Sequence, residues 1–187
     1  DQNLSKLSVD FQKNSLKATN SYKLFVTDES RLKGLSERAL EQAKELAIKE
    51  DRQDAWAFSL QYPSLGPFLK NCEDRALRQE IAEHNGRKAT TGEFSNQGNV
   101  KEQVRLRHER ANLLGYTGHA AFVLEKKMAT NVETVMSFLD DLFVKSKSFA
   151  DSDVQKLKEL AKEDGIENFE SWDLSFYSEK LKKKELN

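Results

Sequence analysis

Apolar side chains recur every three or four residues through most of the chain, and this spacing places them on one face of an α-helix. The first series begins at Leu4, Leu7 and Phe11 and continues toward Tyr22. Only 2 Pro and 8 Gly occur among the 187 residues, so we expect long helices joined by short turns. The hydrophobic pattern therefore predicts a mainly α fold, a bundle of several helices.

Residues that cap free backbone groups mark the ends of several of these helices. Asn99 and Thr130 each precede a Glu by three residues, which is the spacing of a capping box. Gly115 and Gly165 are placed to end the two helices that start at these boxes. Other helices are expected to begin near Ser36, Asp74 and Trp172.

One segment departs from the helical spacing. Large side chains occupy every second position of residues 55–62, and Pro63 ends the run. These side chains are Trp56, Phe58, Leu60 and Tyr62. A period of two is typical of a β-strand, so we predict one short strand here. A single strand leaves its backbone N–H and C=O groups unpaired, and we expect it to be poorly ordered or to pair with another molecule.

Two of the predicted helices have a clear apolar side. The apolar side of the helix from Asn99 consists of Val100, Val104, Ala111 and Leu114. The apolar side of the helix from Thr130 consists of Val132, Val135, Met136, Leu139, Leu142 and Phe143, and Val154, Leu157 and Leu160 extend it.

The charge balance argues against several classes of partner. The chain has 30 basic and 31 acidic residues and a net charge of −1, which gives no overall attraction to nucleic acid or to an anionic membrane. No apolar run reaches the roughly 20 residues that a membrane span needs. Cys72 is the only cysteine, so the chain forms no internal disulfide and no cysteine-based zinc cluster. These features favour a cytoplasmic protein.

One short motif comes within a residue of a zinc-protease signature. In H-E-x-x-H on a helix, both histidines bind the metal and the Glu acts as general base. His108 and Glu109 fit this motif, but Asn112 stands where the second histidine is needed. The spacing gives no reason for the other histidines, His84 and His119, to complete a site. We interpret His108 and Glu109 as polar positions on an amphipathic helix.

Other candidate catalytic groups are equally isolated. Asp140 and Asp141 are adjacent, so on a helix their side chains point about 100° apart and do not hold one substrate jointly. We interpret them as part of a solvated face. Cys72 has no basic partner nearby in the sequence, which indicates a buried or incidental thiol rather than a nucleophile. Residue chemistry alone therefore predicts a helical domain without a catalytic or metal-binding set, and it assigns no substrate-binding residue.

Six segments, taken in order, resemble segments of the thimet oligopeptidase and peptidyl-dipeptidase family of zinc metallopeptidases. They are "LSVDFQKNSLKATNSYKLFVTDESRLKGLSE", "WAFSLQYPSLGPFL", "EDRALRQEI" with an Arg-x-Leu-Arg pattern, "LRHERANLLGY", "KMATNVETVMSFLDDL" and "WDLSFYSEKL". They span nearly the whole chain. Departures are small: Ser36 stands where the family usually has Pro, and Phe176 replaces the first Tyr of a Tyr-Tyr pair.

The resemblance implies that residues 1–187 form a single helical region of a larger metallopeptidase whose N- and C-terminal portions are missing. The intact parent would be a zinc-dependent enzyme that hydrolyses short peptides. In the family the zinc ligands, the general base and the His and Tyr residues that stabilise the transition state lie beyond the Trp-Asp segment. The resemblance therefore implies that this chain contains no catalytic residue and no metal ligand, and that it binds no zinc. It also implies that the chain alone is inactive and that its partner is the remainder of the peptidase.

An alternative from another class stays open. The chain could be a free-standing helical interaction module that keeps the scaffold of the family without its catalytic half. The two hypotheses differ in what the encoding gene contains beyond Asn187.

Overall fold

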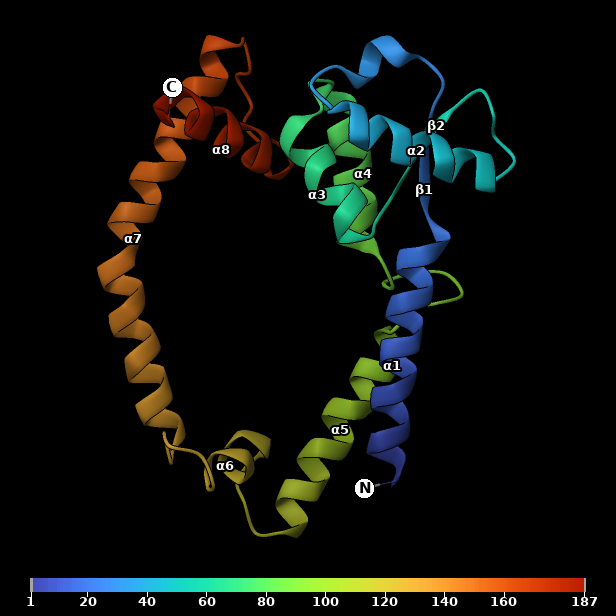
Figure 1. The fold of residues 1–187 in the computed structure, drawn as a ribbon. Helices are drawn as coiled ribbons and strands as arrows, with labels where there is room; N and C mark the ends of the chain where they lie inside the picture. Colours follow the sequence, from blue (N-terminus) through green and yellow to red (C-terminus); the bar gives the residue numbers. More distant parts are fainter. Residues whose placement is uncertain (1, 187) are drawn as a thin grey trace.

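The computed structural model describes residues 2–186 and confirms a mainly α fold (Figure 1). Its strands are β1 (Lys23–Val26) and β2 (Trp56–Ser59). Its helices are α1 (Gln2–Ser21), α2 (Glu37–Lys49), α3 (Tyr62–Asn71), α4 (Arg75–Arg87), α5 (Gln97–Leu113), α6 (His119–Leu124), α7 (Val132–Glu163) and α8 (Ser171–Leu186), with a 3₁₀ turn η1 at Glu29–Leu32. Among residues 2–186, no helix has both the length and the apolarity to cross a bilayer.

The largest core lies where the two strands pack against α2, α3 and α4. We call these five elements the sheet lobe. Phe68 and Ile81 are fully buried there, and Phe58 of β2 tilts against Phe68 with ring centroids 4.5 Å apart. The remaining buried members are Leu24, Val26, Leu32, Ala43, Leu60, Leu65, Cys72 and Leu77. The lobe forms one contiguous core because successive short elements each contribute one or two large apolar side chains.

The predicted strand is present, but the prediction that it has no partner in the chain was wrong. β2 pairs antiparallel with β1, in a register that sets Leu24 opposite Phe58 and Val26 opposite Trp56. Four residues of β1 are too few for a period of two to stand out beside the helical stripe that precedes them. β2 also ends earlier than predicted, at Ser59, because Tyr62 and Pro63 already form the first turn of α3.

α1 and α5 form an arm that leaves the sheet lobe and carries α6 at its far end (Figure 1). Amide side chains join the two long helices. Asn96 donates to the carbonyl of Phe11 and to Ser15 Oγ, both at 3.1 Å, and Asn99 donates to the carbonyl of Leu7 at 2.9 Å. Hydrogen bonds from amide side chains therefore help to hold the arm together.

The predicted apolar side of α5 is mostly exposed. Val100, Val104 and Leu114 are 43%, 61% and 56% exposed, and of the predicted set only Ala111 is fully buried. The polar contacts with α1 turn Gln103 inward instead, where it is 7% exposed. Helical spacing correctly located this apolar stripe, but packing within the chain does not cover it.

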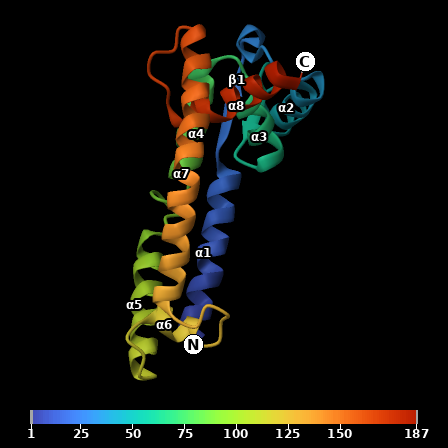
Figure 2. The ribbon, with the colours of Figure 1, turned by 90° about the vertical axis from the view of Figure 1, so that its left-hand side faces the viewer.

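α7 is a single helix of 32 residues that returns from α6 to the sheet lobe. It contacts α6 near its start and α8 near its end, and between these points it stands apart from α1 and α5 (Figure 1). In the side view of Figure 2, α7, α1 and α5 run in roughly the same direction. At its end Leu157, Leu160 and Ala161 form a second core with Tyr177 of α8. The middle of α7 thus has no covering element among the described residues.

Most of the predicted helix ends are confirmed. Ser36 caps α2, Gly115 and Gly165 follow α5 and α7 with φ values of 84° and 80°, and Asp74 caps α4. Both predicted capping boxes were misplaced. α5 begins at Gln97 because Asn99 is engaged with α1, and α7 is capped by Asn131, whose side chain accepts from the Thr134 N–H at 2.8 Å. The last predicted position, Asn187, lies outside the described residues.

Candidate functional site

A buried cluster of charged side chains joins the start of α4 to the start of α8. Asp173 is fully buried and accepts hydrogen bonds from Arg75. Nε donates to Oδ1 at 2.9 Å and to Oδ2 at 3.1 Å, and Nη2 donates to Oδ2 at 2.7 Å. Arg78, which is 2% exposed, donates from Nη2 to Oδ1 at 3.1 Å. The backbone N–H of Glu170 donates to Oδ2 at 3.0 Å. We call Arg75, Arg78 and Asp173 the Asp173 cluster.

The carboxylate of this cluster is held in its charged form. Burial raises the pKa of Asp173, but hydrogen bonds from Arg75, from the Glu170 N–H and from Arg78 outweigh the burial, so the pKa lies below its ordinary value. The hydrogen bonds that Arg75 donates to Asp173 also raise the pKa of Arg75. A buried charge costs little only when it is paired and fully hydrogen-bonded, and Asp173 meets this condition.

Arg78 extends the cluster into the core of the sheet lobe. Its Nη1 donates to the backbone carbonyls of Cys72, at 2.8 Å, and Glu73, at 3.1 Å. These carbonyls lie between α3 and α4, where no helical partner satisfies them. The guanidinium also lies over the ring of Phe176, 4.1 Å from its centroid. One side chain therefore links α3, α4 and α8.

A cleft of about 500 Å³ opens beside the cluster and has a basic rim. Its two cations from α8 are already engaged. Lys180 pairs with Asp164 at 2.6 Å, and Lys183 donates to Asn71 Oδ1 at 3.0 Å. Lys180 and Lys183 therefore tie α8 to its neighbours through oxygen atoms of this chain.

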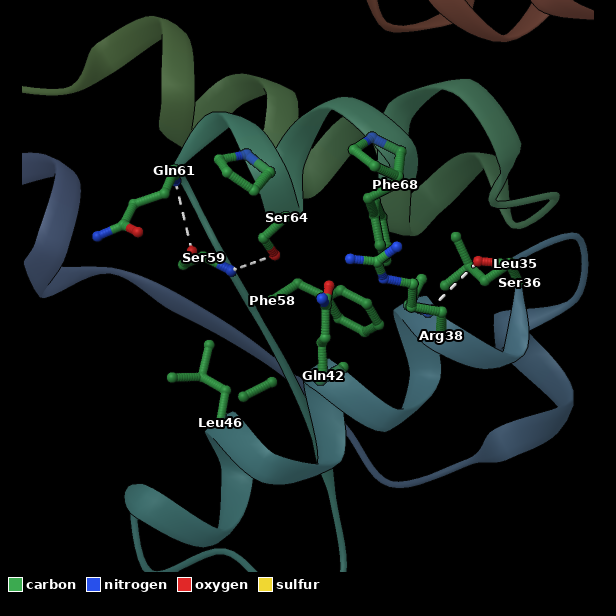
Figure 3. A pocket seen from close by; sticks show the side chains of 15 residues that line it. Leu35, Ser36, Arg38, Gln42, Leu46, Phe58, Ser59, Gln61, Ser64 and Phe68 are labelled. Carbon is green, nitrogen blue, oxygen red and sulfur yellow. Dashed lines mark hydrogen bonds between the residues drawn. The ribbon is translucent and has the colours of Figure 1, made fainter.

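A groove of about 470 Å³ runs along the outer edge of β2, between α2 and α3 (Figure 3). The Ser59 N–H points away from β1 and donates to Ser64 Oγ at 3.0 Å. Phe58 and Leu46 provide apolar lining, and Arg38 is the one titratable residue among those that line it. The groove can accommodate a chain segment or a large side chain, but it lacks the paired acid and base of a hydrolytic centre.

The structure places the histidines of the sequence analysis on three different helices. His108 lies on the exposed side of α5, where its Nε2 is 2.9 Å from Asn112 Nδ2, and Glu109 pairs with Arg105. His84 on α4 stacks on Tyr22 with ring centroids 4.0 Å apart. His119 begins α6, where burial and then the charges of Arg107 and Arg110 lower its pKa.

The other candidate groups are equally separated from one another. Cys72 is fully buried below Arg78, and burial raises the pKa of its thiol to about 11. Asp140 and Asp141 are exposed on α7, and Asp141 pairs with Lys145 at 2.7 Å. Within residues 2–186, no group of three or more His, Cys, Asp and Glu side chains is placed to hold a metal ion.

The fold and the Asp173 cluster define a helical module tied together by an internal ion-pair cluster. Comparison with known proteins places this module in a family: the model of Peptidase family M3 matches residues 68–187, and the chain belongs to that family. It is 35% identical to Oligopeptidase A of Salmonella typhimurium over 185 residues, which is 96% of this chain and 27% of the relative.

Two further relatives give the same result. Oligopeptidase A of Escherichia coli is 34% identical over the same shares of both chains, and Dipeptidyl carboxypeptidase of Escherichia coli is 24% identical over 97% of this chain and 27% of its own length. The chain thus spans about a quarter of the length of these relatives. The resemblance to the oligopeptidase and peptidyl-dipeptidase family is confirmed.

The sequence assigned no role to Arg75, Arg78 and Asp173. A signal was nonetheless present, because "EDRALRQEI" and "WDLSFYSEKL" are two of the segments that resemble the family. The structure brings them into direct contact through Arg78 and Asp173, which are 95 positions apart in the sequence. Only the tertiary fold shows that the arginines of one segment bind the aspartate of the other.

Proposed function

We propose that this chain is the non-catalytic helical portion of a zinc-dependent peptidase that hydrolyses short peptides. The observation that carries the proposal is the Asp173 cluster, in which two segments typical of the family fold onto each other and bury their charges. This cluster serves stability: the Asp173 carboxylate and the terminal nitrogens of Arg78 bond to one another and to backbone groups, and among the polar atoms of Arg78 only the buried Nε has no hydrogen-bond partner within the described residues. The relatives, whose names describe oligopeptidases and a dipeptidyl carboxypeptidase, support peptide hydrolysis by the intact protein.

Among residues 2–186 the side chains are not arranged as a zinc site. Zinc in a catalytic site takes three protein ligands and a water, and the described residues contain no such group of His, Cys, Asp and Glu. We assign zinc, its ligands and the general base to the remainder of the peptidase polypeptide. We also propose that the partners of this chain are that remainder and, for the assembled enzyme, short peptides in the cytoplasm; one relative is named a probable cytosolic oligopeptidase A.

The test is metal content and peptide cleavage by the purified chain. After dialysis against a trace of zinc, elemental analysis is expected to find far less than one equivalent, and a quenched fluorescent peptide is expected to stay intact. His108→Ala is the matched control, because it removes the best single ligand without touching the core. Zinc near one equivalent that disappears in this variant would overturn the assignment.

A second measurement separates the proposal from the interaction-module alternative. A longer protein is expressed that continues past Asn187 with the sequence that follows in the same gene. Its peptidase activity is measured with and without a chelator. Chelator-sensitive cleavage of short peptides is expected. A native stop codon directly after Asn187 would favour the interaction module.

A further inference from the structure

We propose that the exposed apolar face in the middle of α7 is a core face, covered in the intact protein by the remainder of the peptidase polypeptide. This inference rests on the proposed function. We call this face the α7 stripe and define it by Met136, Phe138, Leu139, Leu142, Phe143 and Phe149, which are 48% to 73% exposed. Exposed apolar side chains in such a contiguous group mark an interaction site.

The stripe continues a face that is buried elsewhere on the same helix. At about 100° per residue, Leu157, Leu160 and Ala161 lie at the same angular positions as Leu139, Leu142 and Phe143. The first three are 6%, 4% and 0% exposed because α8 packs on them. This side of α7 is therefore apolar in two stretches, one buried under α8 and one exposed around Leu139, with the polar residues Ser146 and Asp153 between them.

The opposite side of α7 is polar along the same length. Asp141 pairs with Lys145 at 2.7 Å and Lys147 with Asp151 at 2.6 Å, away from the stripe. A helix with one charged and one apolar side is typical of the surface of a globular core. The apolar side is the one that lacks a neighbour in this chain.

The width of the stripe distinguishes a core from a dimer seam. The six side chains cover roughly 160° of the helix circumference at about 100° per residue, whereas a coiled coil of two copies needs a narrow stripe sustained over several heptads. The heptad positions that follow Leu139 are Ser146 and Asp153, so no such seam continues. A face this wide needs more than one covering helix, which fits a larger polypeptide better than a second copy of α7.

The relatives show that such a polypeptide accompanies this module. This chain matches 27% of the length of Oligopeptidase A, so the relatives carry about three quarters of their sequence outside the matched region. We infer that helical segments from that sequence complete the core whose first layer is the α7 stripe.

The experiment mixes this chain with the remainder of the peptidase polypeptide, expressed separately from the same gene, and measures complex formation by sedimentation velocity. The test variant is Leu139→Glu with Phe143→Lys, which places an opposite-charge pair four residues apart and so preserves the helix. The matched control is Val144→Glu with Ser148→Lys, the same pair on the polar side of α7, where Val144 is 73% exposed. Circular dichroism checks that both variants keep their helices.

The wild-type chain and the control variant are expected to bind the remainder with equal affinity, and the stripe variant at least about 100-fold more weakly. Equal affinity for all three proteins would overturn the inference. It would also be overturned if the wild-type chain alone formed a dimer and the stripe variant were a monomer, because the stripe would then bind a second copy. Cleavage of a short peptide by the mixture is measured separately. A stripe-dependent complex without cleavage would contradict the proposed function and leave this inference standing.

Discussion

The middle and the end of α7 carry similar apolar residues, which are exposed in the middle and buried at the end. Near the end of the helix, Leu160 is buried against Tyr177 and sits close to the Asp173 cluster, which ties α8 to α4. In the middle, Leu139 lies on the same side of the helix and is 48% exposed. An apolar helical face contributes to stability only where another element covers it, and we expect the coverage here to depend on the charged contacts between α8 and α4.

The largest expected effect comes from removing the buried carboxylate. Asp173→Ala leaves Arg78 buried without its partner, and we expect the free energy of unfolding to fall by about 3–5 kcal/mol. Chemical denaturation followed by circular dichroism measures this change. Asp141→Ala removes an exposed ion pair on α7 and is expected to cost less than about 1 kcal/mol. Similar losses in both variants would show that the Asp173 cluster does not hold α8.

Replacing Leu160 and Leu139 by Ala, one at a time, compares the end and the middle of α7 directly. Leu160→Ala creates a cavity in a packed core and is expected to cost about 2–5 kcal/mol. Leu139→Ala in the same chain is expected to change the free energy of unfolding by no more than about 0.5 kcal/mol. The same pair of substitutions in the longer protein gives the sharper result, because a covered stripe would bring the cost of Leu139→Ala close to that of Leu160→Ala.

Acidification is expected to weaken the Asp173 cluster. The pKa of Asp173 in the folded chain lies below its ordinary value of 3.8, so the folded state holds fewer protons than the unfolded state. The stabilisation is therefore complete above pH 3.8 and is lost as the pH falls toward the folded pKa. Unfolding curves recorded between about pH 6 and pH 3 should show a smaller pH dependence for Asp173→Asn than for the wild type. An unchanged pH dependence would contradict this assignment.

The smallest effect concerns the thiol below the cluster. Burial raises the pKa of Cys72 to about 11, so at pH 8 the thiol is protonated and inaccessible. The reaction of Cys72 with a disulfide reagent is expected to be slow in the folded wild type. In denaturant its rate is expected to rise to that of a free thiol. Faster labelling of Asp173→Ala without denaturant would show that local opening between α3 and α4 accompanies loss of the cluster.

Local sequence rules determined most of the helices, because spacing and capping act over a few residues. Ser36, Asp74, Gly115 and Gly165 mark helix ends that the structure confirms. The same rules failed where a distant contact competed with a local one. Asn99 has the spacing of a capping residue, but its side chain is bonded to the Leu7 carbonyl and to Gln103, so α5 begins two residues earlier.

The pairing of β1 with β2 could not be read from the chain, because four alternating residues carry too little pattern and their partner lies about 30 positions away. The Asp173 cluster was hidden for the same reason. Arg75, Arg78 and Asp173 look like ordinary charged positions on helices, and only the approach of α8 to α4 pairs them. In the folded chain Arg78 and Asp173 are buried and Arg75 is partly exposed. The sequence determined that one side of α7 is apolar, whereas the tertiary structure decided that α8 covers this side near the end of the helix and leaves the α7 stripe open, since burial depends on which elements meet in space.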